Sequence, residues 1–198
     1  MKHLLTVVAV LSSAIALPAF AALKTGESAP DFSAPASLSG KEFAFSLKDA
    51  LKKGPVVVYF YPSAYTGGCN IEAHTFAVNK DKFDAVGATI IGVSHDSIAR
   101  LNDFSADPEY CAGKFPVASD ADGKIAKSYD LKVMEGKPGM KDTRGVDIDH
   151  AFTERTTFVI APDGKIVATL SSADDKISPA DHVSKSLAVV SEMKNKTM

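Results

Sequence analysis

The chain has 198 residues, of which 45% are hydrophobic and 23% are charged, and its formal net charge at pH 7 is −2. This composition is typical of one globular domain and excludes collagen-like, low-complexity and disordered proteins. The near balance of 22 basic and 24 acidic residues gives no electrostatic footprint for nucleic acid or an anionic membrane, so we expect neither partner. The presence of only two cysteines excludes a disulfide-dense mini-fold and a four-cysteine zinc site, and we expect no metal ion and no cofactor.

The first residues have the pattern of a secretory signal peptide. A short basic start precedes an apolar run over residues 4–17, and Ala19-Phe20-Ala21 supplies the small residues of a cleavage site. The run is too short to span a bilayer comfortably, and no second hydrophobic segment follows it. We therefore expect residues 1–21 to be removed, with cleavage after Ala22 as the second choice. The product would be one soluble domain of residues 22–198 in the periplasm or outside the cell, where disulfides persist.

The first half of this domain predicts a strand, a helix and a second strand. Residues 24–38 are interpreted as irregular and residues 43–51 as short and mixed. The continuous apolar run 56–61 (VVVYFY) is typical of a strand that is buried on both faces. Apolar residues then recur at helical spacing over 69–86, and residues 88–94 (ATIIGVS) form a second buried strand. This is a βαβ unit with parallel strands.

The second half has more antiparallel character. In chain order we expect a short strand at 115–119, a short helix at 125–129, a long loop at 132–150, a hairpin of 156–160 with 166–170, and a closing helix after Ser178-Pro179. Together the elements predict an α/β domain with a thioredoxin-like fold, in which a central mixed β-sheet is flanked by helices.

The candidate chemistry lies where the first strand meets the long helix. Cys69 falls in the first helical turn if the helix begins near Thr66, and the helix dipole there favours a thiolate. Thr66 can cap the helix and offer its hydroxyl to the sulfur or to an oxygen on it, while Pro62 stiffens the approach. The spacing alone equally allows Cys69 to be a small buried side chain on the apolar face of the helix.

At these residues the chain resembles the peroxiredoxin family. Pro62, Thr66 and Cys69 match the pattern P-x-x-x-T-x-x-C. The preceding VVVYFYP and the following Glu72 look like the Q-type, or bacterioferritin-comigratory, branch of that family. The resemblance implies a thiol-dependent peroxidase that reduces hydrogen peroxide and organic hydroperoxides.

Two further segments carry the resemblance across most of the chain. Residues 26–32 (GESAPDF) look like the opening segment of the family, and residues 155–165 (RTTFVIAPDGK) look like its late arginine-bearing strand and hairpin. By resemblance, Cys69 is the peroxidatic cysteine, whose thiolate is oxidised to sulfenic acid. Thr66 and Arg155 would position the peroxide and stabilise its charge. Without the resemblance, Arg155 would be interpreted as a surface charge at a strand end.

The second cysteine departs from the commonest family pattern. His74 stands five residues after Cys69, where many Q-type members carry the resolving cysteine, and we interpret it as a solvated helix residue. Cys111 lies in the region of the helix after the second strand, where other Q-type members carry it. The resemblance therefore implies an intramolecular Cys69–Cys111 disulfide that a thioredoxin-like dithiol protein reduces, in a monomer or weak homodimer.

Three alternatives remain open from the sequence. The two cysteines could form a static structural disulfide. The chain could be an exported thioredoxin-fold thiol–disulfide oxidoreductase, although no C-x-x-C motif surrounds Cys69. It could also be a copper carrier similar to Sco proteins, with Cys69, His74, His95 and Cys111 as ligands.

The other polar residues receive plainer interpretations. We expect His95, His150 and His182 to lie at the surface and to form no catalytic triad. The charges of loop 132–150 are interpreted as a solvated surface that can flank the entrance to the site.

Overall fold

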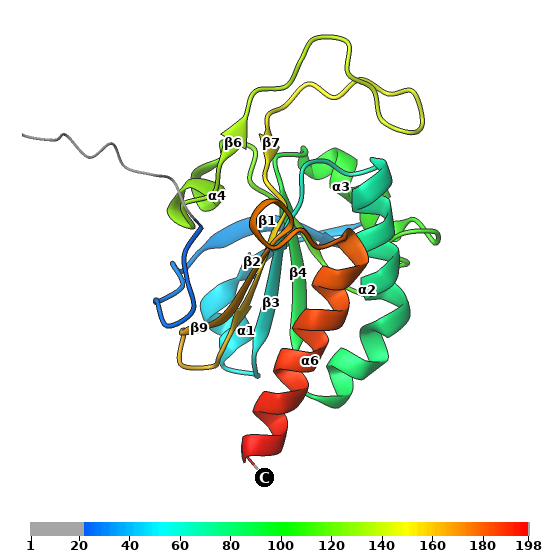
Figure 1. The fold of residues 1–198 in the computed structure, drawn as a ribbon. Coiled ribbons are helices and arrows are strands. Elements are labelled where there is room, and N and C mark those ends of the chain that lie inside the picture. The colour runs from blue at the N-terminus through cyan, green and yellow to red at the C-terminus, as the bar shows by residue number, and fades with distance from the viewer. Residues whose placement is uncertain (1–21, 198) are drawn as a thin grey trace, which may run out of the picture.

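The computed structural model describes residues 22–197, in which strands and helices alternate from residue 41 to residue 134 (Figure 1). The expected signal peptide, residues 1–21, lies outside the described residues. The strands are β1 (Ser33–Leu38), β2 (Lys41–Ser46), β3 (Val56–Phe60), β4 (Thr89–Ser94), β5 (Val117–Ser119), β6 (Val133–Met134), β7 (Phe152–Thr153), β8 (Thr156–Ile160) and β9 (Ile166–Ser171). The helices are α1 (Leu47–Leu51), α2 (Gly67–Ala85), α3 (Ile98–Ala106), α4 (Lys124–Ser128), α5 (Ser172–Asp175) and α6 (Pro179–Thr197).

The central sheet has seven strands in the order β2-β1-β5-β4-β3-β8-β9. β3 is parallel to β4, as the predicted βαβ unit requires, and β8 pairs with β3 and β9 in antiparallel fashion. The predicted α/β class and mixed sheet are therefore confirmed. β5 also joins β4 in parallel, so the second half is less antiparallel than its sequence suggested.

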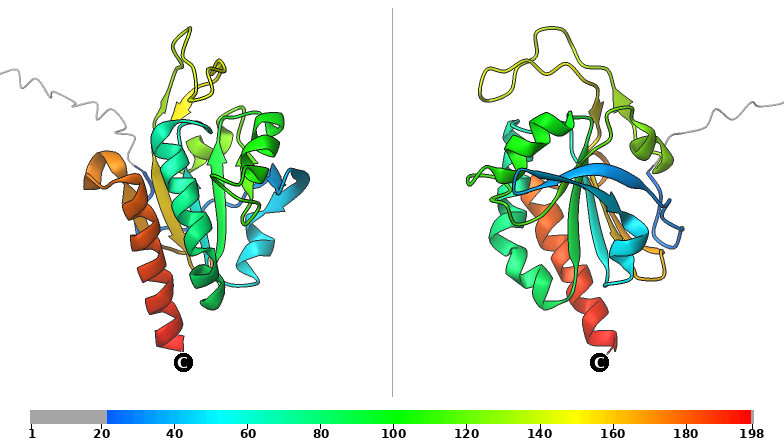
Figure 2. Two further views of the ribbon diagram at one scale, coloured as in Figure 1. Left: turned by 90° about the vertical axis from the view of Figure 1, so that its right-hand side faces the viewer. Right: turned by 180° about the vertical axis from the view of Figure 1, so that it is seen from behind.

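Two apolar clusters cover the two faces of this sheet. Successive residues of β3 point to opposite faces, so Val57 and Tyr59 pack under α2, α3 and α6 while Val58 and Phe60 pack under α1 and α4. All five residues of β3 are buried, as its uninterrupted apolar run predicts. α2 and α6 pack against each other on the first face (Figure 2).

The prediction for residues 24–38 was wrong in its second half, where β1 forms. Pro35 lies inside β1 at a position that β5 does not reach, because β5 pairs only with Ala36 and Ser37. A strand tolerates proline where one neighbouring strand is missing. The mixed segment 43–51 contains the end of β2 followed by α1.

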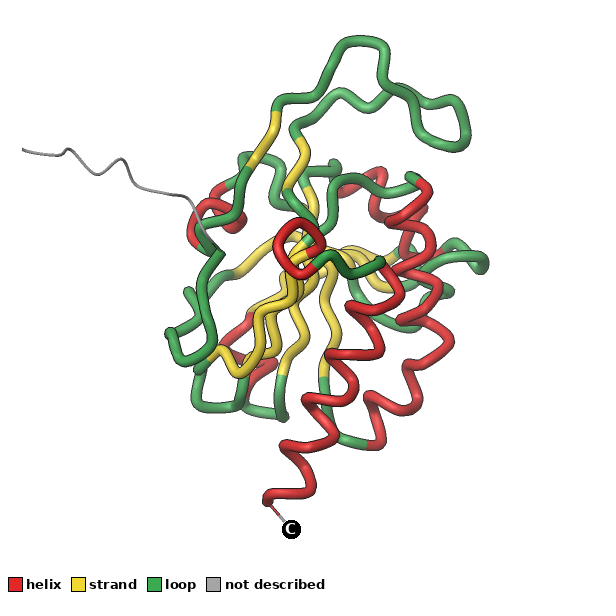
Figure 3. Tube along the Cα trace, viewed as in Figure 1, coloured by secondary structure: helices red, strands yellow, loops and turns green. Residues whose placement is uncertain are grey.

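A long loop leaves the domain between β6 and β7, as predicted for residues 132–150. It arches away from the sheet and returns toward the N-terminal end of α2 and the end of α3 (Figure 3). β6 and β7 pair at its base as a separate two-stranded sheet. Within residues 22–197, no helix combines the length and the apolar character needed to cross a bilayer.

Candidate active site

Cys69 lies in the first turn of α2, where its sequence position predicted it. Pro62 is the second residue after β3, and Thr66 occupies the N-cap position of α2 in extended conformation. Cys69 is 2% exposed, so its sulfur is almost completely shielded from water. The backbone N–H groups of this first turn are not used by the helix itself and create a positive environment around the sulfur.

Arg155, the residue immediately before β8, contacts the same sulfur. Its Nη2 donates to Sγ of Cys69 at 3.2 Å, and its side chain is 10% exposed. The interpretation of Arg155 as a surface charge is therefore wrong. Gly68 makes this approach possible, because a Cβ there would lie 3.1 Å from Nη2 and 3.3 Å from Cγ of Pro179.

The carboxyl group of Glu72 contacts the other side of the guanidinium. Glu72 stands one helical turn after Cys69, is fully buried, and pairs through Oε2 with Nη1 of Arg155. Burial raises the pKa of Glu72 to about 7, against the opposing effect of Arg155. Its other oxygen, Oε1, has no hydrogen-bond partner among the described residues. The sequence contained one signal for this contact, a carboxylate on the same helix face as Cys69.

Thr66 is placed as predicted but bonded differently. Its side chain makes no capping hydrogen bond to α2, and its hydroxyl instead donates to the carbonyl oxygen of Ser63 at 2.8 Å. The hydroxyl thus fixes the loop between Pro62 and the helix. Its oxygen still has lone pairs, so it can accept a hydrogen bond from a bound hydroperoxide.

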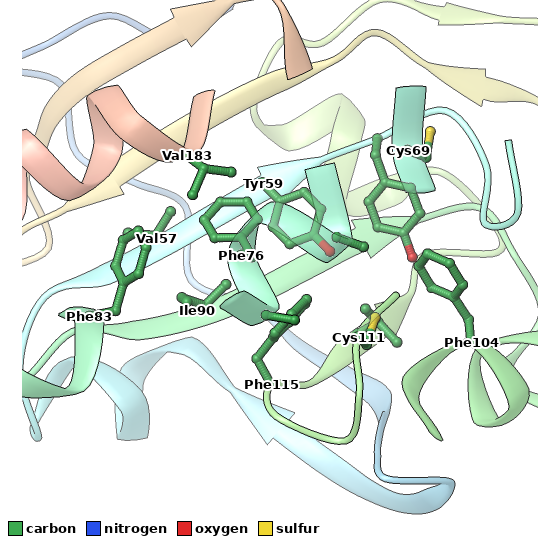
Figure 4. Close-up of a cluster of buried hydrophobic side chains, with 14 of the residues drawn as sticks. Val57, Tyr59, Cys69, Phe76, Phe83, Ile90, Phe104, Cys111, Phe115 and Val183 are labelled. Atoms are coloured by element: carbon green, nitrogen blue, oxygen red, sulfur yellow. The ribbon is translucent and has the colours of Figure 1, made fainter. Parts of the chain in front are cut away.

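Cys111 lies in the same apolar cluster as Cys69 but is not bonded to it. Both cysteines are free thiols, and Cys111 is fully buried in the turns that follow α3. Burial raises the pKa of the Cys111 thiol. Figure 4 shows the two cysteines apart, with aromatic side chains of the cluster between them. His74 is exposed, as predicted, and its Nδ1 lies 2.9 Å from the carbonyl oxygen of Glu109.

The expectation that three histidines lie at the surface was wrong. His95 is 4% exposed and His182 is fully buried, while the side chain of His150 is 12% exposed. Each ring has hydrogen-bond partners, which is what makes burial of a polar ring tolerable. Sequence patterns do not reveal these partners, because they come from distant elements.

His150 contacts a serine and an aspartate, but not in the manner of a catalytic triad. Oγ of Ser63 and Oδ1 of Asp96 both approach the same ring nitrogen, Nε2, at 3.3 and 2.9 Å. A relay needs the serine and the carboxylate on opposite nitrogens. The cluster is instead an ion-pair network, in which Arg100 Nε also lies 2.8 Å from Asp96 Oδ1.

The proposed copper ligands do not form one site. His74 contacts the carbonyl of Glu109, whereas His95 lies 2.6 Å from the hydroxyl of Thr153. Among the described residues, no group of three or more histidine, cysteine or carboxylate side chains is arranged to hold a metal ion.

Comparisons with known proteins indicate one family. The sequence model of the AhpC/TSA family matches residues 25–169. The protein "Peroxiredoxin Bcp" of Xanthomonas campestris pv. campestris is 33% identical over 135 residues, which are 68% of this chain and 75% of that protein. "Peroxiredoxin Bcp" of Bacillus subtilis is 29% identical over 88% of this chain and 99% of that protein.

Solved structures show the same relationship. The peroxidoxin BcpB structure from Mycobacterium tuberculosis has a TM-score of 0.70 and 32% identity, with 86% of this chain and 97% of that chain covered. A peroxiredoxin Q structure from Xanthomonas campestris has a TM-score of 0.62 and 31% identity, with 81% of this chain and 90% of that chain covered. These structures share the mixed sheet and flanking helices described above.

Proposed function

The chain belongs to the AhpC/TSA family and is a Bcp-like peroxiredoxin, a thiol peroxidase, in which we propose that Cys69 is the peroxidatic residue. The observation that carries this assignment is the 3.2 Å contact from Arg155 Nη2 to the Cys69 sulfur at the start of α2. A guanidinium and a helix N-terminus together stabilise the thiolate that the reaction needs.

In the first step the Cys69 thiolate attacks one peroxide oxygen. An S–O bond forms and the O–O bond breaks, so that the sulfur becomes a sulfenic acid and the second oxygen leaves as an alkoxide or hydroxide that takes up a proton. Arg155 and the first-turn N–H groups of α2 stabilise the charge as it moves to the leaving oxygen. The Thr66 hydroxyl oxygen accepts a hydrogen bond from the hydroperoxide O–H, and Pro62 fixes the loop that carries Thr66.

In the second step Cys111 is the resolving residue. Its sulfur attacks the Cys69 sulfenic acid, the S–O bond breaks, and the hydroxyl leaves as water with the Cys111 proton. The two segments must move first, because both thiols are buried and aromatic side chains lie between them. A thioredoxin-type dithiol protein then reduces the disulfide and is itself oxidised.

We extend the proposed peroxidase function to a class of substrate and to a cellular compartment. Structural work on the Xanthomonas campestris bacterioferritin comigratory protein concerns its alkyl peroxide reduction activity. We extend that substrate class to this chain, together with hydrogen peroxide. The basic and apolar start of the sequence supports export to the periplasm, where the chain would act as a monomer or weak homodimer.

The proposed roles are tested by intact-mass spectrometry after one equivalent of peroxide. We expect the reduced wild type to lose two hydrogens as the disulfide forms, and Cys111→Ser to gain one oxygen because its sulfenic acid has no resolving partner. Cys69→Ser should show neither change, because a serine hydroxyl provides no thiolate near neutral pH.

Turnover with a dithiol reductant completes the test. Cys111→Ser should stall after one reaction and overoxidise readily to sulfinic acid. Full dithiol-driven turnover by Cys111→Ser would contradict the two-cysteine cycle, and unchanged peroxide reduction by Cys69→Ser would contradict the assignment of Cys69.

A further inference from the structure

Tyr65 belongs to the loop between β3 and α2, which we call the peroxidatic loop, and it contacts a short segment of the long loop, Asp142–Arg144, which we call the strap. Tyr65 immediately precedes the N-cap Thr66 and has a positive φ of 61°. A left-handed backbone is unfavourable for a bulky residue unless its surroundings hold it. Thr143 supplies that support, because its N–H and its hydroxyl each donate to the Tyr65 carbonyl at 2.9 Å.

Arg144 covers the ring of the same tyrosine. Its Cζ lies 3.2 Å from the centroid of the Tyr65 ring, which is a cation–π contact. Tyr65 is 2% exposed, so the guanidinium is part of what shields it from water. The strap therefore contacts both the backbone and the side chain of one residue in the peroxidatic loop.

A largely buried ion pair fixes the strap to the domain. The fully buried Asp142 side chain accepts from Arg100 Nη2 of α3 at 2.8 Å, and within the strap it accepts from Arg144 Nη2 at 2.9 Å. Arg100 in turn pairs with Asp96, whose Oδ2 accepts from the N–H of Ala64 at 2.7 Å. The strap is thus connected to α3 and to the residue next to Tyr65, although it belongs to a surface loop (Figure 1).

The other side of Tyr65 faces the segment that carries Cys111. The rings of Phe104 and Tyr110 meet the Tyr65 ring edge-on, at centroid distances of 5.0 and 5.6 Å. Tyr110 directly precedes Cys111. Movement of Cys111 toward Cys69 must therefore separate Tyr110 from Tyr65 or shift Tyr65 itself, and the strap opposes the second of these movements.

We propose that Arg144 is a positioning residue that clamps Tyr65 and thereby limits the rate at which Cys111 reaches oxidised Cys69. This inference rests on the proposed function, in which the Cys111 sulfur displaces the sulfenic hydroxyl of Cys69 as water and forms the disulfide. Arg144 takes no part in that chemistry. It stabilises the closed arrangement and so sets how long the sulfenic acid persists before it is resolved or overoxidised.

The first experiment measures opening without peroxide. In a Cys69→Ser background, Cys111 is the only thiol, and its alkylation rate reports how often its segment opens. We expect Arg144→Ala to raise that rate about 3- to 30-fold, the range of a partly to fully desolvated cation–π contact. Arg144→Lys should restore part of the protection, and Thr143→Val, which keeps the N–H donor, should give a smaller rise.

Lys141→Ala is the matched control. Lys141 belongs to the same loop and pairs with Asp147, but both side chains are more than half exposed and neither is in the strap. This variant should open at the wild-type rate. Loss of a contact of the closed state lowers the unfolding free energy in either case, so the urea dependence of the alkylation rate separates the two explanations. Exposure of Cys111 by global unfolding should make the rate of Arg144→Ala rise with urea as steeply as unfolding itself, whereas release of the clamp should give a fast rate that is nearly independent of urea at low concentration.

The second experiment measures disulfide formation by quenched-flow mass spectrometry in the two-cysteine protein. We expect Arg144→Ala to form the Cys69–Cys111 disulfide faster and to need more peroxide for half-maximal overoxidation. Alkylation and disulfide rates equal to those of Lys141→Ala would overturn the clamp. Absence of any Cys69–Cys111 disulfide in the wild type would instead overturn the resolving role of Cys111, which the alkylation experiment does not depend on.

Discussion

Arg155 serves two acidic groups with one planar side chain. Nη1 pairs with Glu72 and Nη2 donates to the Cys69 sulfur, so both ends of the guanidinium are fixed. A guanidinium can do this because it carries five donors in a rigid fork and stays charged at any relevant pH. Glu72 therefore orients the cation that acts on the sulfur, while its raised pKa of about 7 limits how much negative charge it places beside the thiolate.

Replacement of Arg155 should slow the oxidation of Cys69 by peroxide. Arg155→Ala removes a preorganised charge and donor, so we expect the second-order rate of Cys69 oxidation to fall about 10²- to 10³-fold. Arg155→Lys keeps the charge but cannot contact the Glu72 carboxyl and the Cys69 sulfur together. Its oxidation rate should therefore lie between the rates of Arg155→Ala and the wild type. Stopped-flow oxidation by peroxide measures the rates. A rate for Arg155→Ala within threefold of the wild type would contradict the assigned role.

The sequence predicted some of these residues and not others for a physical reason. Cys69 and Thr66 lie on one local motif at a strand–helix junction, and local patterns determine such junctions. The pairing of Glu72 with Arg155 joins residues 83 positions apart, so no local pattern contains it. Tyr65 was unremarkable in the sequence because the strap that holds it lies 78 positions later.

At the scale of elements, His182 connects the closing helix α6 to β8, the strand that directly follows Arg155. His182 of α6 is fully buried, and its two ring nitrogens each lie 2.9 Å from a hydroxyl, those of Thr157 in β8 and Ser172 in α5. Burial and the nearby positive charge of Arg155 lower the pKa of His182 to about 4, against the opposing effects of Asp175 and Asp181. The neutral ring therefore belongs to the folded state.

This junction should make stability depend on pH. Between pH 6.5 and pH 4 the unfolded chain binds a proton at residue 182 that the folded chain does not, so His182 lowers the unfolding free energy as the pH falls. From the size of the shift we expect His182 to contribute a loss of about 2–3 kcal/mol at pH 4 relative to pH 7. The raised pKa of Glu72 acts in the opposite direction over the same range, so the His182 contribution is the difference between the wild type and a variant without this histidine. Urea unfolding at a series of pH values measures it.

Matched variants separate this effect from the titration of carboxylates. His182→Gln should lose about 2–3 kcal/mol less unfolding free energy than the wild type between pH 7 and pH 4, because the amide does not titrate. His74→Gln, at an exposed helix position, should keep the wild-type dependence. Equal slopes for His182→Gln and wild type would show that His182 does not lose a proton on folding.

The elements themselves were predicted where their own pattern was strong. The continuous apolar run of β3, the helical spacing of α2 and the turn between β8 and β9 each specify one element without help from the rest of the chain. β1 was not predicted because its alternating small residues and proline have little strand propensity. Its pairing with β2 and β5 determines its conformation instead. The burial of Asp142 in the strap likewise depends on Arg100 of another element.

At the scale of the whole molecule, the first described residues already contact the folded domain. The N–H of Leu23 donates to the carbonyl of Tyr129 at 3.3 Å, and the Leu23 carbonyl accepts from the Thr169 hydroxyl at 2.7 Å. Ala22 and Leu23 also pack against the apolar cluster under α1 and α4. A mature protein that begins at Ala22 would therefore keep all of these contacts.

We expect the chain to be cleaved after Ala21. When the full chain is expressed in a Gram-negative host, we expect the periplasmic fraction to contain protein whose intact mass and N-terminal sequence begin at Ala22. The reason is the Ala19-Phe20-Ala21 site after the apolar run, because the peptidase requires small residues there. Ala19→Arg should block processing, whereas Ala22→Ser, beyond the site, should be processed normally. Recovery of the uncleaved chain from the cytoplasm alone would contradict export, and an N-terminus at Leu23 would move the site by one residue while leaving the export signal in place.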